Sequence, residues 1–450
     1  MPYRFVSLSV SVFLIFLLAV PCRAQVQDNA ASSPEVSFED AVRTALSNAR
    51  EVRLAAHDVR IRTEGRTVAA SRRLPRVDAS ADYTALSEPP SVFIQGNPIQ
   101  TSDQNVWRAR VTAEQTIFDF GRTRSRVDQA DARIDNAVRN EGLARERQAL
   151  EVISAFLSAK RAEELRQVAE ESLATAKDHR RVAGDQYEFG VVAKNDVLAA
   201  DVQVANAESA LIVAENQAEL SRSRLALRMG YPGDRSFSPA PGPFPVPPPA
   251  VPPLSESLRT ALEKRNELRA QDAVVREGEA AVSAARTEFA PTLFGQGGYS
   301  YETNDFNPNK SVFSILLGGK VNLFSGFADD ASLRQARANV NRRKDALGKL
   351  QDEVALDVKG AHLFVAEAEK RKAVAVVAVA RAEENLRIQN DRYMEGLSIS
   401  TEVLDAQALL TRAKVDRQNA VYDLFEARYR LLAARGELLE FLAPMIVAGR

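Results

Sequence analysis

The chain has 450 residues, 59 basic and 60 acidic side chains, and a formal net charge of −1. This balance excludes the basic field that nucleic-acid binding requires, so no nucleic-acid partner is expected. The chain is rich in Ala, Arg, Glu, Leu and Val and only 7% aromatic, which is typical of long exposed helices rather than of two or three globular domains.

Residues 1–24 predict a secretory signal peptide. Arg4 precedes an apolar run from Val10 to Val20, and Ala24 is the small residue before the expected cleavage site. The single cysteine, Cys22, lies in the part that cleavage would remove. Lipidation of Cys22 is the alternative, although Pro21 fits a lipidation motif poorly. Beyond the signal there is no run of 18 apolar residues, so we expect any membrane crossing to be made by strands.

The rest of the chain is an internal repeat. The first copy spans residues 25–230 and the second 254–440, followed by a C-terminal tail over 441–450. Matching pairs begin at an offset of 216 and continue at 206, which places a longer loop in the first copy. These pairs include Arg43 with Arg259, Pro75 with Pro291, Phe118 with Phe324, Tyr187 with Tyr393, and Gly230 with Gly436. The proline-rich stretch 231–253 predicts an extended connector.

Each copy predicts one long helix beside two stacked shorter helices. In the first copy, Arg122 to Gln186 is flanked by helical stretches over 38–72 and 195–228, whose combined length matches it. The second copy repeats this plan, with a long helix over 327–393. Apolar residues at alternating spacings of three and four predict a coiled-coil seam in that helix. The seam comprises Leu333, Ala336, Val340, Leu347, Leu350, Val354, Ala361, Phe364 and Ala368.

Two segments with a period of two interrupt the helices, at about 75–120 and 291–325. Val77, Ala79, Ala81 and Tyr83 alternate with charged or small polar residues, as do the residues around Trp107. Each segment therefore predicts a strand pair with one apolar and one polar face. Trp107 fits an aromatic belt at a lipid interface, and ordinary strand packing is the alternative.

Four strands cannot close a barrel, and open strand edges are not tolerated in lipid. Two chains would supply eight strands and fill the barrel with side chains, whereas three would supply twelve and leave a lumen. The periodicity does not choose between these two assemblies.

The duplicated plan resembles the TolC-like outer-membrane efflux protein family over essentially the whole mature chain. The specific motifs are Phe118–Arg122 and Leu323–Gly326, where strand passes into helix, and Tyr187–Gly190 and Tyr393–Gly396 at the helical turns. The resemblance implies a mostly α fold with a membrane β-barrel portion. It also implies a homotrimer with a twelve-stranded barrel and a periplasmic helical tunnel, located in the outer membrane, working with a periplasmic adaptor and, through it, an inner-membrane transporter.

The resemblance also places a pore constriction at the periplasmic end. By position from the glycine turn, its acids would be Glu402 and Asp405, which share one helix face. Asp196 corresponds to Glu402 in the first copy, and Ala199 replaces the second acid. The alternative is an ordinary solvated helix face.

The two tips, 187–195 and 393–401, would meet the adaptor, and glycine turns join strand to helix. The adaptor-facing residues would be Phe189, Gly190, Val191, Gly396, Leu397 and Ser398, and the strand-to-helix turns Gly121 and Gly326. Tyr187 and Tyr393 are possible hydrogen-bonding residues near the closed end, and helix packing is the alternative.

No enzymatic motif is apparent, and neither a cofactor nor a metal is expected. His57, His179 and His362 lack ligand-type spacing, and there is no phosphate-binding glycine loop. The leading hypothesis is therefore an outer-membrane duct that exports small molecules for a tripartite pump. The alternatives are the outer-membrane component of type I protein secretion and a coiled-coil protein without a pore.

Overall fold

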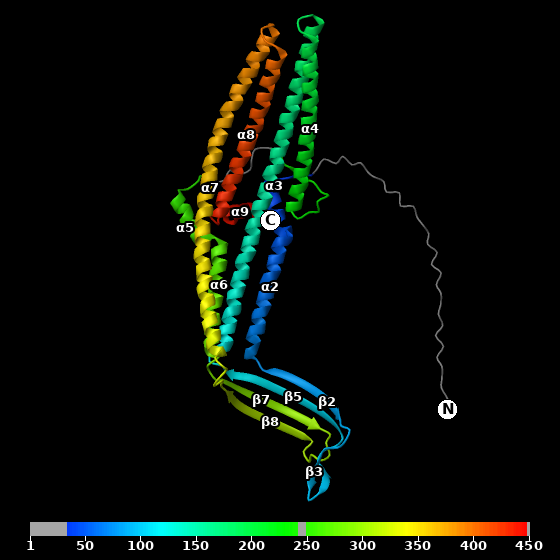
Figure 1. The fold of residues 1–450 in the computed structure, drawn as a ribbon, viewed down its shortest axis with the longest axis vertical. Coiled ribbons are helices and arrows are strands. Elements are labelled where there is room, and N and C mark those ends of the chain that lie inside the picture. Colours follow the sequence, from blue (N-terminus) through cyan, green and yellow to red (C-terminus); the bar gives the residue numbers. More distant parts are fainter. Residues whose placement is uncertain (1–33, 242–248, 448–450) are drawn as a thin grey trace, which may run out of the picture.

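The computed structural model describes residues 34–241 and 249–447; the predicted signal peptide and part of the proline-rich connector lie outside these ranges. The described chain is strongly elongated, with paired helices at one end and a curved sheet at the other (Figure 1). The two repeats lie side by side along its whole length.

Two continuous helices form the frame of the molecule. Helix α3 (Arg122–Glu188) and helix α7 (Ala328–Met394) each have 67 residues, which corresponds to a length of about 100 Å. Helices α4 (Lys194–Arg228) and α8 (Ser400–Ala434) fold back along their outer halves, away from the sheet. This is the arrangement that the matched lengths predicted.

The predicted helix that precedes the strands is broken in both copies, which the sequence did not indicate. The first consists of α1 (Phe38–Asn48), α2 (Arg50–Ala70) and the short η1 (Ser71–Arg73), and the second of α5 (Leu254–Lys264) and α6 (Asn266–Thr287). The backbone leaves the helical region at Ala49 (ψ 132°) and Arg265 (ψ 126°). No proline or glycine marks either break.

Each break lies against a glycine that follows the shorter hairpin helix of the same copy, α4 or α8. A Cβ atom on Gly230 would lie 3.0 Å from the backbone of Asn48, and one on Gly436 would lie 3.1 Å from the backbone nitrogen of Arg265. Both glycines also have positive φ, which other residues adopt only with strain. The repeated glycines therefore allow a close crossing of the chain at mid-height in both halves.

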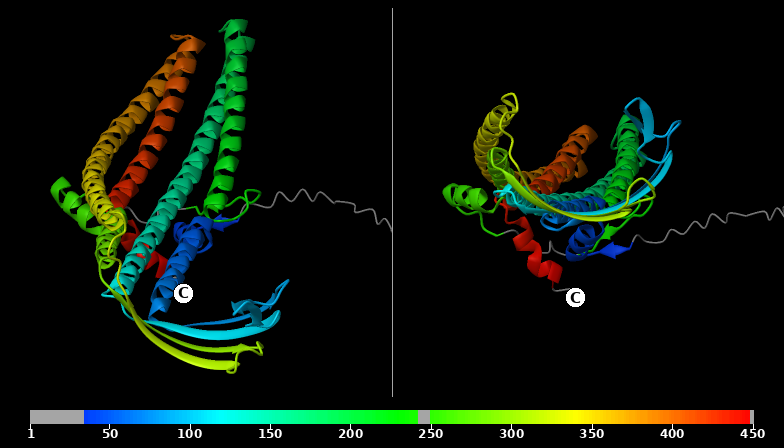
Figure 2. Two further views of the ribbon diagram at one scale, coloured as in Figure 1. Left: turned by 60° about the horizontal axis from the view of Figure 1, so that its bottom comes forward. Right: turned by 90° about the horizontal axis from the view of Figure 1, so that it is seen from below.

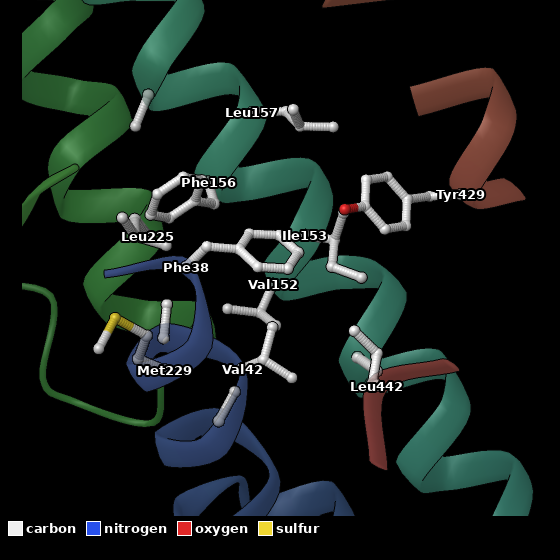
Figure 3. Close-up of a cluster of buried hydrophobic side chains, with 14 of the residues drawn as sticks. Phe38, Val42, Val152, Ile153, Phe156, Leu157, Leu225, Met229, Tyr429 and Leu442 are labelled. Atoms are coloured by element: carbon white, nitrogen blue, oxygen red, sulfur yellow. The ribbon is translucent and has the colours of Figure 1, made fainter. Parts of the chain in front are cut away.

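The largest apolar core also lies at mid-height, where α1, α3, α4 and α8 meet α9 (Leu438–Val447) (Figure 3). Phe38, only 1% exposed, contacts Phe156 edge-on at 5.5 Å between ring centroids and Tyr429 at 5.8 Å. Nearby, β1 (Glu35–Val36) pairs in parallel with β6 (Ser238–Pro239) of the connector. Helix α9 runs across residue 440, the predicted end of the second copy, and Leu442 packs into this core.

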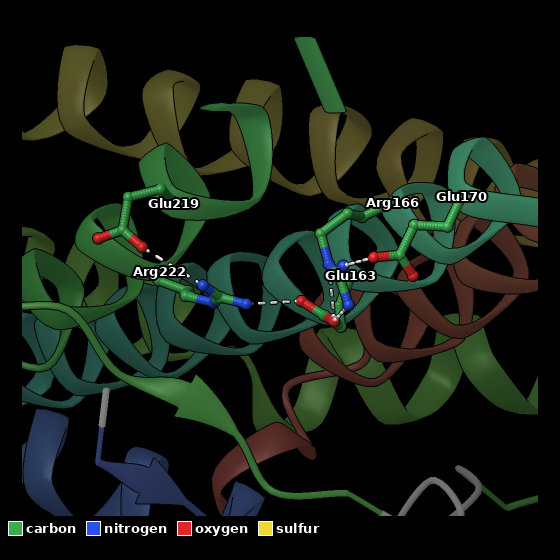
Figure 4. A network of polar contacts seen from close by, with 5 residues as sticks. All are labelled: Glu163, Arg166, Glu170, Glu219 and Arg222. Atoms are coloured by element: carbon green, nitrogen blue, oxygen red, sulfur yellow. Dashed lines mark hydrogen bonds and ion pairs between the residues drawn. The ribbon is translucent and has the colours of Figure 1, made fainter. Parts of the chain in front are cut away.

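Ion pairs fix α4 to α3 above this core (Figure 4). Glu163 on α3 accepts from Arg222 of α4 at 2.7 Å and from Arg166 at 2.7 Å, and Arg166 also pairs with Glu170. Partial burial opposes the ionisation of Glu163, but the hydrogen bonds from the two arginines outweigh it and lower its pKa.

The predicted seam of α7 is correct in part. Val340, Val354, Ala361 and Ala368 are buried as expected, whereas Phe364 is 62% exposed. Val358 and Val365 are buried instead, the first against α5 and α6 and the second against α8. The packed face of α7 therefore shifts where its partner changes from α6 to α8, which a single heptad frame does not anticipate.

The four predicted strands form one antiparallel sheet of order β2-β5-β7-β8. They are β2 (Arg76–Ala85), β5 (Asn105–Phe118), β7 (Thr292–Glu302) and β8 (Ser311–Lys320). The longer loop of the first copy contains a further hairpin, β3 (Ser91–Ile94) and β4 (Asn97–Gln100), which the sequence analysis did not predict. Figure 2 shows that the sheet is curved, as part of a barrel wall would be.

Candidate functional site

The two helical hairpins end in the same kind of turn, at the end of the molecule remote from the sheet. Gly190 (φ 73°) and Gly396 (φ 71°) are left-handed. The amide of Val191 donates to the carbonyl of Gln186, and that of Leu397 to the carbonyl of Arg392, each at 2.8 Å. These are Schellman caps, and the positive φ explains the glycine at each turn.

The residues around both turns present apolar side chains to solvent. Phe189 is 85% exposed, and Val191, Met394, Leu397 and Ile399 are also exposed. Ser398, predicted to lie with them, donates instead to Glu402 at 2.6 Å. Exposed apolar clusters of this kind mark contact surfaces.

Glu402 and Asp405 lie in the first two turns of α8 and share an exposed helix face, while the next residue after each, Val403 and Ala406, packs inward. Glu402 lies 4.0 Å from Arg392, and among the described residues Asp405 has no ion-pair partner. The two carboxylates therefore point away from the protomer's own core, as a ring of acids would require.

Asp196 lies elsewhere. It is partly buried in the first turn of α4, and its charge acts on His179 of α3 and Tyr393 of α7. The structure thus brings Glu402 and Asp405 together and places Asp196 at the contact between the two hairpins.

The contact between the hairpins contains a buried polar pair that the sequence analysis missed. Nε2 of His179 lies 2.9 Å from Oγ of Ser400, and its ring packs 5.2 Å from that of Tyr393. Burial lowers the pKa of His179, and the nearby Asp196 carboxylate opposes this shift. The two residues are 221 positions apart, and their spacing in the sequence gave no signal of this contact.

The sheet separates apolar from polar side chains across its first two strands. Val77, Ala79, Ala81 and Tyr83 of β2 pair with Ala113, Val111, Ala109 and Trp107 of β5. The opposite face pairs Arg76 with Glu114 and Asp82 with Arg108, and Arg108 bonds Glu302 of β7 at 3.1 Å.

On β8 the apolar face continues through Phe313 and Ile315, which pair with Tyr299 and Gly297 of β7. Trp107, 57% exposed, stacks on Tyr83 with ring centroids 4.9 Å apart, near one end of this face. In the described part of the chain, no strand pairs with the outer edge of β2 or of β8.

Tight turns connect this sheet to the long helices. Gly121 (φ 93°) and Gly326 (φ 62°) are left-handed, and so are their aromatic neighbours Phe120 (φ 53°) and Phe327 (φ 67°). The carboxylate of Asp119 caps α3 by accepting from the amide of Thr123 at 2.8 Å. A left-handed phenylalanine is unusual, so both turns hold exposed aromatic rings in place at some conformational cost.

Several helices also carry exposed apolar residues seven positions apart. These are Leu54, Ile61 and Val68 on α2, Val213, Leu220 and Leu227 on α4, and Leu356 and Leu363 on α7. By length and mean hydropathy α4 is also a candidate membrane span, and 11% of that stretch is buried. A single such helix is weak support for a span, whereas a heptad stripe is typical of a helix that packs against another helix.

A cavity of about 850 Å³ lies between α3, α7 and α8 at mid-height. Glu146 on α3 lines it, and Oε1 of this residue is buried without a hydrogen-bond partner among the described residues. Burial and the nearby Glu267 carboxylate raise the pKa of Glu146 to about 7, against the opposing effect of Arg265. No group of three or more potential ligands that could hold a metal occurs within residues 34–241 and 249–447.

The profile of a family described as "Outer membrane efflux protein" matches residues 41–231 and 257–437. The chain is 28% identical over 338 residues to Protein CyaE of Bordetella pertussis, which covers 73% of this chain and 70% of that protein. A membrane protein from Pseudomonas aeruginosa has a similar structure, with a TM-score of 0.79 at 19% identity, covering 90% of this chain and 91% of the other. The open state of the MtrE outer membrane channel of Neisseria gonorrhoeae is also similar, with a TM-score of 0.71 at 20% identity and 89% coverage of both chains.

Proposed function

Because this chain belongs to the outer membrane efflux protein family, we propose that three copies of it form a duct that exports small molecules. The sheets together form a twelve-stranded barrel, and the helices form a tunnel in the periplasm. Location in the outer membrane and a channel role in an efflux or secretion system follow from the family and from the fold that it shares with solved outer-membrane channels. What we propose beyond this is the number of copies, the gate, the partners and the cargo.

The single observation that carries the proposal is the sheet, with its two unpaired edges and its apolar and charged faces. Unpaired strand edges are not tolerated in lipid, so β8 of one copy must pair with β2 of the next. The apolar face then contacts lipid and the charged face lines a water-filled lumen. Twelve strands, unlike eight, leave such a lumen open.

The exposed stripes of the helices support the same closure. Helices α2 and α4 lie on one side of the protomer and α7 lies on the opposite side (Figure 1), and each carries such a stripe of exposed residues. Rotational symmetry brings these two sides together, and burying both stripes gives the helices the coiled-coil contacts that they lack within one protomer.

Glu402 and Asp405 form the constriction in this proposal. Threefold symmetry turns each exposed carboxylate into a ring of three, and two such rings lie one helical turn apart. Concentrated negative charge attracts cations and repels anions at a narrow point. Asp196 does not take part in the constriction, because it lies partly buried between the hairpins.

The exposed apolar tips provide the docking surface for a periplasmic adaptor, which links the duct to an inner-membrane transporter. Phe189 and Leu397 are the most exposed apolar residues of their respective turns. Replacing both with serine should abolish adaptor capture in a pull-down with the co-expressed adaptor and leave the trimer intact. Unchanged capture would mean that the tips are not the docking surface for the adaptor.

The gate is tested by planar-bilayer recording of Glu402→Gln and Asp405→Asn beside the parent. Each change removes one ring of charge with little change in shape, so cation selectivity should fall in both and fall furthest in the double variant. Glu395→Gln, an exposed acid at the same tip outside the proposed ring, is the matched control. Equal selectivity in the parent, both single variants, the double variant and the control would refute the assignment.

The cargo is tested in a host that lacks its own export duct, supplied with this chain and its co-encoded pump. Restored resistance to toxic small molecules supports the proposal, whereas release of a protein substrate without any gain in resistance would replace small-molecule efflux with type I secretion.

A further inference from the structure

The hairpin β3–β4 extends beyond the sheet at the end opposite to the helices (Figure 1). It lies on the concave side of the sheet, which is the inner side of any barrel that the sheet completes (Figure 2). The second copy has only a short loop at the corresponding place, between β7 and β8. Each protomer therefore has one such hairpin, near the outward mouth of the proposed duct.

Both faces of this hairpin are apolar and exposed. Val92 and Ile99 pair across one face, and Phe93, 75% exposed, pairs with Pro98 across the other. Residues 89–101 contain no charged side chain, although 26% of the whole chain is charged. An isolated two-stranded hairpin is at best marginally stable in water, so this one needs a surface to pack against.

The base of the hairpin is held in place. The amide of Thr101 donates to the carbonyl of Pro90 at 2.8 Å, and the amide of Asp103 donates to Oδ1 of Asn304 in the β7–β8 loop at 3.1 Å. The tip is a two-residue turn with positive φ at both Gln95 (51°) and Gly96 (83°), a geometry that matches the twist of a regular hairpin. The hairpin is thus an ordered projection with a fixed direction.

The length of the hairpin matches the distance to the axis of the proposed barrel. Four residues per strand span about 13 Å. Twelve strands spaced about 4.8 Å apart and tilted by about 40° enclose a barrel of radius about 12 Å. A hairpin that projects inward from each protomer therefore reaches the threefold axis, and without charge three of them can meet there without repulsion.

We propose that the three β3–β4 hairpins pack against one another at the axis and form an apolar lid over the outward mouth of the duct. Each hairpin thus packs its apolar surface against the equivalent hairpins of the other two copies. The inference rests on the proposed trimeric duct. Packing against lipid does not fit the concave position of the hairpin, because lipid lies outside the barrel.

Cysteine cross-linking tests the lid in the full-length protein. Phe93→Cys places a thiol at the proposed contact, and Glu88→Cys places one on the same exposed loop before the hairpin. Because Cys22 lies in the predicted signal peptide, Cys22→Ser provides a background free of other thiols. Mild oxidation of purified trimers should link Phe93→Cys into covalent dimers several-fold more efficiently than Glu88→Cys.

Conductance gives a second readout. Phe93→Asp brings three negative charges together at the axis, so the lid should open. The single-channel conductance of a trimer whose periplasmic constriction is open should then rise. Glu88→Gln should leave this conductance unchanged. Trimers that conduct but show neither the cross-link nor the rise in conductance would overturn the lid alone. A chain that forms no trimer would overturn the proposed function and the lid with it.

Discussion

Replacing Glu146 with glutamine should stabilise the protein at alkaline pH and leave it unchanged in acid. Glu146 lines the mid-height cavity, and its Oε1 atom is buried without a hydrogen-bond partner within residues 34–241 and 249–447. Burial, together with the Glu267 charge, raises the pKa of Glu146 to about 7 from an ordinary value of 4.5. The folded protein therefore binds this proton more tightly than the unfolded chain does.

The sign follows from proton linkage. The stability that the neutral carboxyl provides is fully present below pH 4.5 and is lost as the pH rises to about 7. A shift of this size corresponds to about 3 kcal/mol for a fully buried group, and the partial exposure of Glu146 reduces the expected loss to about 2 kcal/mol. Glutamine has a similar shape and no charge, so it should escape this loss.

The assay is thermal unfolding in detergent, followed by circular dichroism at pH 4.5 and pH 8.5. Glu146→Gln should raise the unfolding midpoint by about 2 °C or more at pH 8.5 and change it little at pH 4.5. Glu141→Gln is the matched control, because that residue lies on the same helix and pairs with Arg145 at 2.8 Å. A gain of equal size at both pH values, or none at pH 8.5, would refute the reasoning.

Three further predictions use the same purified protein. Phe38→Ala should lower the unfolding free energy by about 3–5 kcal/mol, measured by chemical denaturation, because it empties a buried site between two other aromatic rings. Gly436→Ala should lower the unfolding free energy by about 1–3 kcal/mol, because its φ is positive and a Cβ would press on Arg265. Gly348→Ala, within a helix and with open space around it, should instead stabilise the protein slightly. Thermal unfolding midpoints distinguish the two variants. Burial lowers the pKa of His179 below its ordinary value of 6.5, so below that pH the opening of its contact with Ser400 is coupled to protonation and should become easier. Amide protection factors at the tips should therefore be lower at pH 5.5 than at pH 7.5. His179→Gln should remove most of that pH dependence.

The repeat, the strand pairs and the long helices could be predicted because their signals are periodic. The matched lengths of long and short helices required only the rise of 1.5 Å per residue. The alternation around Val77 and Trp107 gave two strands and assigned their faces correctly, since side-chain direction in a strand follows sequence position alone.

The helix breaks and the full seam could not be predicted, because they depend on contacts between distant parts of the chain. Ala49 and Arg265 favour helix locally, and each leaves it where a glycine far along the chain, Gly230 or Gly436, allows a close crossing. Phe364 satisfies the heptad pattern, but the change of partner along α7 leaves it exposed. The β3–β4 hairpin escaped notice because its four-residue strands are too short to show alternation.

The candidate site was predicted unevenly for the same reason. The glycine turns follow from local backbone chemistry, and the structure places Glu402 and Asp405 on one exposed face as their spacing requires. Whether they line a constriction stays a prediction. The pairing of His179 with Ser400, 221 positions apart, depends on how the two hairpins pack and left no signal in the spacing.

The central claim, a trimeric duct gated by Glu402 and Asp405, is tested most directly by planar-bilayer recording of the detergent-purified trimer beside its Glu402→Ala and Asp405→Ala double variant. We expect brief, cation-selective openings from the parent and larger, less selective openings from the variant. Bilayers that stay silent with both proteins, although each is confirmed as a trimer, would contradict the account.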